Sequence, residues 1–167
     1  MAFLGAMATF TVMTACAEPP SLAAFGYFRQ ILPGIPAAPG PAAGNQRPGL
    51  PPEYFLYVEV APGGRASVDW AAIRGEYYSA SLRRVNTPVL IDEDAAVPTG
   101  KKETLVPNSR NDVYQVVLGD KRAGNPRDEK AAALVRRNDF AARITTDDTH
   151  AYAVVKTLTA LRPKAGM

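Results

Sequence analysis

The sequence predicts an α+β fold, in which a small mixed sheet with two to three helices is preceded by an apolar N-terminus and a Pro-rich linker. Runs of β-branched and aromatic residues bounded by Gly and Pro indicate short strands. Between these runs, apolar residues spaced three and four apart, next to capping residues, indicate helices. An apolar fraction of 47% in 167 residues is sufficient for one buried core.

The composition excludes several classes of protein. The net charge of +3 comes from mixed-charge segments without a basic stripe, so we expect no nucleic-acid partner. One cysteine excludes an intrachain disulfide and a multi-cysteine metal site, and one histidine argues against a histidine metal site or a catalytic triad. The sequence contains no nucleophile–base pair and no cofactor fingerprint. We therefore predict a protein that is not an enzyme, with no catalytic residues, cofactor or metal.

Residues 1–17 have the character of a targeting or anchor segment. They contain no charged side chain, and the apolar stretch 2–13 has the length of a signal-peptide core but is too short to span a bilayer. Ala15-Cys16-Ala17 fits a cleavage site, and Met13-Thr14-Ala15-Cys16 is similar to a bacterial lipobox, in which Cys16 would be lipidated. The alternatives are a short apolar helix packed on the domain or a partner, and the truncated end of a membrane anchor.

Residues 18–52 predict a short helix followed by a linker. Ser21 is a suitable cap for a helix that carries Leu22, Phe25 and Phe28 at spacings of three. The stretch 31–52 contains seven prolines, which exclude a helix or the interior of a sheet. We expect an extended tether between the N-terminal segment and the domain, or alternatively a coil that lies on the surface.

Residues 53–167 predict the folded domain. The stretch 54–60 is apolar on both faces and indicates a central strand, with 65–69 returning as its hairpin partner. Further strands are expected at 88–91, 112–118 and 140–146. Helices are expected at 70–85, at 127–138 and after Asp147 or Asp148, the last with Val154, Leu158 and Leu161 on one face and Pro163 at its end.

Two groups of polar residues invite a functional interpretation. The triplet Asp92-Glu93-Asp94 follows a strand and offers carboxylate oxygens to a divalent cation, but the residues after it lack the pattern of a calcium loop. We therefore expect a solvated loop. His150 falls in the first turn of the last helix, where Asp147 is its nearest acidic partner; an exposed histidine at an acidic helix start is the simpler interpretation.

The C-terminal stretch resembles the ExbD/TolR family of biopolymer-transport proteins. The residues that carry this resemblance are Ile144, Asp147, Tyr152, Val154-Val155, Leu158, Leu161 and Ala165-Gly166, together with Gly63-Gly64-Arg65 within 54–69. The resemblance implies a small α+β envelope domain that dimerises and meets a partner or peptidoglycan across its sheet. Residues 1–16 contain no Asp or Glu, so the family's proton-coupling role does not carry over.

Together these observations predict a non-enzymatic cell-envelope protein. We expect it to be periplasmic, anchored to the membrane through its N-terminus or secreted, and to act as a tethered interaction domain. Its expected partners are proteins, with a second copy of the chain as one candidate. The alternative is a structural subunit of a larger macromolecular assembly, with the N-terminal arm lying on neighbouring subunits.

Overall fold

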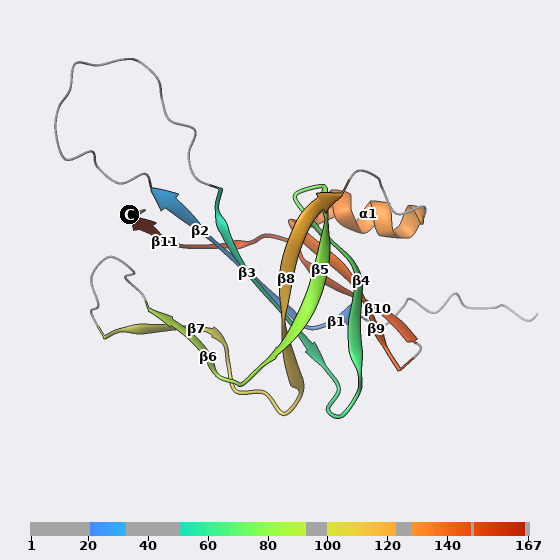
Figure 1. The fold of residues 1–167 in the computed structure, drawn as a ribbon, viewed down its shortest axis with the longest axis horizontal. Coiled ribbons are helices and arrows are strands. Elements are labelled where there is room, and N and C mark those ends of the chain that lie inside the picture. Colours follow the sequence, from blue (N-terminus) through green and yellow to red (C-terminus); the bar gives the residue numbers. More distant parts are fainter. Residues whose placement is uncertain (1–20, 33–50, 93–99, 123–127, 148, 166–167) are drawn as a thin grey trace, which may run out of the picture.

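The computed structural model describes residues 21–32, 51–92, 100–122, 128–147 and 149–165, and in them the chain is almost entirely β (Figure 1). It contains eleven strands and one helix, so the predicted α+β fold with two to three helices is wrong. The elements are β1 Ser21–Leu22, β2 Ala24–Leu32, β3 Glu53–Val60, β4 Ala66–Ile73, β5 Glu76–Val85, β6 Val89–Asp92, β7 Lys102–Val106, β8 Asp112–Arg122, α1 Glu129–Arg137, β9 Phe140–Thr146, β10 Thr149–Val155 and β11 Thr159–Ala165.

Nine of the strands form one sheet that closes on itself. The order is β1-β10-β9-β4-β5-β8-β3-β2-β11. Only Ala23 separates β1 from β2, so the segment 21–32 joins the two ends of this order. One side of the segment is antiparallel to β3, and the other side is parallel to β10 and then to β11. The strands therefore enclose a central core rather than covering a flat layer.

Alternate residues of the strands fill the inside of the closed sheet. Because successive side chains of a strand point to opposite faces, every second residue lies in this core. Its fully buried members include Phe140, Leu56 and Ile144. The remaining members are Val58, Val60, Ala71, Ile73, Val116, Ala142, Ala153 and Leu158.

Two smaller elements cover parts of the outer surface. The β6–β7 hairpin buries Leu105 and Val106 against Tyr57, Val113 and Leu161. On another part of the surface, α1 packs Val135 against Ala72, Ala141 and Tyr77. The strand 53–60 is therefore buried on both faces, as its sequence predicted, because Leu56 and Val58 face the core and Tyr57 faces the hairpin.

The helix predicted at 70–85 is instead the end of β4, a tight turn and β5. Arg74 and Gly75 both have positive φ, 48° and 86°, which is the backbone of a two-residue hairpin turn. After the turn, Tyr78, Ala80 and Leu82 face the core, and residues between them face outward. The apolar residues therefore follow a period of two from residue 76, and the helical spacing of Trp70, Ile73 and Tyr77 arises from two strands separated by a turn.

The predicted helices at 21–30 and after Asp147 are also wrong. Residues 21–32 form β1 and β2, and the tail forms β10 and β11 with a bend at 156–157. Leu158 and Leu161, which were expected on one face of a helix, belong to the inner core and to the outer cluster under β6–β7, respectively. Pairing with strands distant in sequence overrides the weak helical pattern of these stretches.

Four of the remaining elements agree with the sequence, whereas β7 was not predicted. Strands at 88–91, 112–118 and 140–146 are confirmed as β6, β8 and β9, and the helix at 127–138 as α1. The side chain of Asp128 caps α1 by accepting a hydrogen bond from the Lys130 backbone N–H at 2.9 Å. We expected the domain to begin at Glu53, yet β1 and β2 precede it, and the Pro-rich segment connects β2 to β3.

Candidate functional site

The chain between β3 and β4 crosses from one side of the closed sheet to the other. The predicted hairpin of 54–60 with 65–69 does not form, because β5 and β8 lie between β3 and β4 in the sheet. The crossing segment therefore passes over one end of the sheet. Gly63 has a φ of 84° in this segment, and its N–H donates to the buried Asp112 carboxylate at 3.1 Å, which holds the crossing in place.

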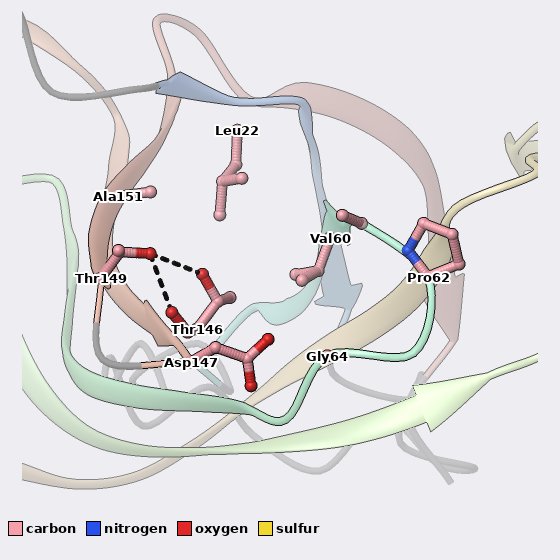
Figure 2. Close-up of a pocket in the computed structure, with 9 residues that line it drawn as sticks. Leu22, Val60, Pro62, Gly64, Thr146, Asp147, Thr149 and Ala151 are labelled. Atoms are coloured by element: carbon pink, nitrogen blue, oxygen red, sulfur yellow. Dashed lines mark hydrogen bonds between the residues drawn. The ribbon is translucent and has the colours of Figure 1, made fainter.

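A pocket lies under this crossing segment, at the end of the closed sheet (Figure 2). Its volume is about 240 Å³, and its walls come from β1, the β3–β4 crossing and the β9–β10 turn. The lining residues are Leu22, Val60, Ala61, Pro62, Gly64, Thr146, Asp147, Thr149 and Ala151. Figure 2 shows Leu22 above Thr146, Thr149 and Asp147 and shows Val60 and Pro62 to their right, so an apolar wall faces a polar wall, while Ala151 stands beside Thr149.

Asp147 is the charged residue of this pocket. It adopts φ of 41° in the β9–β10 turn, a conformation that Asp and Asn accept more readily than other residues with side chains. Its Oδ2 is 3.0 Å from the position that a Cβ on Gly64 would occupy, so the absence of a side chain at Gly64 makes room for the carboxylate. Among the described residues, Asp147 forms no hydrogen bond or ion pair.

The two threonines of the polar wall are linked to each other. Thr149 Oγ1 donates to the Thr146 carbonyl at 2.8 Å, and the two hydroxyl oxygens are 3.3 Å apart. Each hydroxyl oxygen can still accept a hydrogen bond from a ligand. The polar wall therefore presents three acceptor groups, one of them the carboxylate of Asp147.

A wider and more open hollow adjoins the pocket at Asp147. It is lined by Arg65, Ala66, Ser67, Thr145 and Asp147. Arg65 and Asp147 line the same hollow without forming an ion pair with each other. A ligand held at Asp147 would therefore have a cationic side chain near it on the outer side.

A polar network lies on the outer face of β4, β9 and β10. The Thr145 hydroxyl donates to Asp69 at 3.0 Å and lies 2.8 Å from His150 Nδ1, so this nitrogen carries the proton and donates to Thr145. Arg143 Nε is 3.1 Å from Asp69 Oδ2, a charge contact that is misaligned for a hydrogen bond. The Thr145 hydroxyl therefore donates its proton to the Asp69 carboxylate and not to the His150 imidazole. The network connects β4, β9 and β10.

The structure answers several of the site predictions. His150 is exposed, as the simpler interpretation had it, but it lies on β10 rather than at a helix start. It contacts Thr145 and lies 3.6 Å from Asp69, and Asp147, the candidate partner, is not paired with it. The carbonyl of Asp92 accepts a hydrogen bond from Arg29 at 3.2 Å. Among the described residues no group of His, Cys, Asp and Glu could hold a metal ion. The lipidation candidate Cys16 and the acids Glu93 and Asp94 lie outside the described residues.

Arg29 on β2 is a buried charged side chain that the sequence did not single out. It is 5% exposed, and its guanidinium lies 5.7 Å from the ring centre of Phe55. Its bond to the Asp92 carbonyl connects β2 to the β6–β7 hairpin. We assign it a structural role in docking this hairpin, because burying a charge is tolerated only with such contacts.

The N-terminus of α1 is held by a partly buried contact. The Tyr152 hydroxyl donates to Asp128 at 2.9 Å. This bond, with the Lys130 N–H, lowers the pKa of Asp128 below its ordinary value. Burial and the same carboxylate raise the pKa of Tyr152. Trp70 packs on Tyr152 with ring centres 6.2 Å apart, so the cap and the aromatic pair fix α1 on the sheet.

Comparison with known protein families, with characterised proteins and with solved structures gave no match. Within the described residues, no helix has the length and the apolar character needed to cross a membrane. The site must therefore be interpreted from its own chemistry. Sequence reasoning named Asp147 as a helix cap, as a candidate partner of His150 and as part of the family resemblance, but not as a pocket residue. The signal for the pocket was the pair of turns at Pro62–Gly64 and at Asp147, which the fold brings together.

Proposed function

We propose that this chain is a non-enzymatic interaction domain of the cell envelope, anchored at its N-terminus through Cys16. The observation that carries the proposal is the position of the first strand. The uncharged segment 1–17 and its lipobox-like Met13-Thr14-Ala15-Cys16 stand directly before β1, which begins at Ser21. The resemblance to the ExbD/TolR family does not support the proposal, because the helix expected for that resemblance is replaced by β10 and β11.

This arrangement changes where the anchor would hold the domain. Ser21, the first residue of β1, is only five positions after Cys16. Five extended residues span at most about 18 Å. A lipid on Cys16 would hold the closed sheet next to the membrane, and the Pro-rich segment, which connects β2 to β3, would not act as the spacer. Leu22, which follows soon after Cys16 in the sequence, lines the pocket at Asp147. This pocket would therefore lie close to the membrane surface.

The test is the intact mass of the protein from its own cells, with membrane and soluble fractions analysed separately. We expect a membrane-bound chain that begins at Cys16 and carries added lipid mass. The matched variant Cys16→Ala should lose this mass and leave the membrane fraction. A chain that begins at Met1 in the soluble fraction would contradict the proposal, and would leave a subunit of a larger assembly as the interpretation to test.

A further inference from the structure

We infer that the pocket at Asp147 binds the side chain of a lysine from a partner protein. The inference rests on the proposed function as an interaction domain and gives the chemistry of its partner. It is built on three observations: an unpaired carboxylate, an apolar wall opposite it, and a volume suited to one side chain. Each of them restricts the ligand.

Asp147 is exposed to solvent, and a cationic group is the ligand that complements its carboxylate. Asp147 forms no hydrogen bond or ion pair within the described part of the chain, and its backbone at φ of 41° fixes it at the turn. Thr146 and Thr149 add hydroxyl oxygens beside it. An ammonium has three donors that can reach three separate acceptors, whereas a guanidinium presents a planar fork suited to one carboxylate. The polar wall therefore favours an ammonium.

The apolar wall requires a hydrocarbon stem. Leu22, Val60 and Pro62 face the polar wall across the pocket (Figure 2). A lysine carries its charge on a four-carbon stem that is commonly buried along apolar surface, and so it matches both walls at once. The ethanolamine of a lipid headgroup has an ammonium but only a short stem, so it would leave the apolar wall uncovered.

The volume agrees with a single side chain. Sites for small-molecule ligands typically enclose about 300–1,000 Å³, whereas this pocket encloses about 240 Å³. Arg65 lies in the adjoining hollow, on the outer side of Asp147. It would repel a second cation, so the lysine should be an isolated one or have an acidic residue beside it in the partner.

The experiment is an NMR titration of the full chain with Nα-acetyl-lysine N-methylamide. Its matched ligand is Nα-acetyl-norleucine N-methylamide, which has an alkyl side chain and no ammonium. A lone side chain makes few contacts, so we expect a Kd on the order of 1–10 mM for the lysine compound. The norleucine compound should bind at least about tenfold more weakly, because it leaves Asp147 without a charged partner.

The matched variants are Asp147→Asn and Asp120→Asn. Asn accepts the positive φ of residue 147, so the first variant should fold and weaken lysine binding by about tenfold or more. The second removes the same charge from an exposed position on β8 and should change the Kd by less than about twofold. Thr149→Val, which removes a neutral acceptor, should weaken binding by about threefold to tenfold.

Several results would overturn the inference. Equal affinity for the two compounds, absence of lysine binding, or an unchanged Kd in Asp147→Asn would each do so. Binding to phosphatidylethanolamine vesicles that depends on Asp147, with no binding of the lysine compound, would replace the protein partner by a lipid headgroup. More than tenfold tighter binding of 1,5-diaminopentane would indicate a free polyamine. The mass of the native chain tests the anchor independently, so failure of either claim can be told from failure of the other.

Discussion

Gly26 lies against Leu158 in the core of the closed sheet, where there is no room for a side chain on residue 26. Gly26 is a buried residue of β2. It lies next to the connection between β10 and β11. A Cβ at residue 26 would lie 2.5 Å from Leu158 Cδ2 and 3.2 Å from both γ-carbons of Val155. Leu158 Cδ2 would have to shift to make room, and Leu158 is buried in the core, so we predict that Gly26→Ala destabilises the protein and that Leu158→Ala relieves this effect.

The magnitudes follow from two opposing terms. Replacing Gly by Ala within a strand would by itself gain about 0.5–1 kcal/mol, because the unfolded chain becomes less flexible. Overpacking a core costs about 1–3 kcal/mol, so the difference between the centres of the two ranges gives a net loss of about 1 kcal/mol for Gly26→Ala. Leu158→Ala should cost about 3 kcal/mol through the lost burial and the cavity.

The double variant should be less destabilised than the sum of the two changes. With Leu158 truncated, the new methyl group fills part of the cavity, and the coupling should offset about 1–2 kcal/mol. The assay is urea unfolding followed by the fluorescence of Trp70, the single tryptophan. The control cycle pairs Gly26→Ala with Leu161→Ala, which truncates a residue of the outer cluster and should be additive within about 0.5 kcal/mol.

The reasoning would be refuted by a Gly26→Ala variant as stable as the native protein, or by strict additivity with Leu158→Ala. Either result would mean that β10 and β11 do not pack over β2 as described. Equal coupling in the control cycle would show that the effect does not come from this contact.

Two further predictions concern buried or capping carboxylates. Because the pKa of Asp128 is lower in the folded protein, its contribution is present above the unfolded pKa and is lost as the pH falls through the folded value. The stability difference between the native protein and Asp128→Asn should therefore be largest near pH 7 and shrink towards pH 2, and Tyr152→Phe should reduce it; a pH-independent difference would contradict this. Asp112→Ala removes the acceptor of the Gly63 N–H and should cost about 1–3 kcal/mol by thermal unfolding, whereas the exposed Asp120→Ala should stay within about 0.5 kcal/mol.

Local chemistry was sufficient to predict several elements. The β-branched and aromatic run at 54–60 and the run at 140–146 are strands, and the segment with early acids and late arginines is α1. In each of these stretches, the intrinsic propensities of the residues, the capping residues and the hydrophobic pattern indicate the same secondary structure. No contact with a distant segment is therefore needed to choose between helix and strand.

The errors have a common physical origin. Trp70, Ile73 and Tyr77 are spaced as in a helix because they lie on two strands that a two-residue turn separates, and the positive φ of Arg74 could not be read from its residue type. In the tail, Val154 faces outward on β10, which pairs with β9, and Leu158 faces inward just before β11, which pairs with β2. β2 and β11 pair although they are more than one hundred positions apart in the sequence, so the interactions that make 159–165 a strand come from a distant segment.

The sequence by itself determined that the chain has a buried core, where its helix and its clearest strands lie, and that an uncharged segment with Cys16 precedes Ser21. Only the tertiary structure decided that the sheet closes through residues 21–32, that residues 61–65 cross its end, and that Asp147 faces an apolar wall there. The reason is that these features depend on which strands pair. Pairing between strands is set by the summed fit of side chains on distant segments, and no local pattern contains that information.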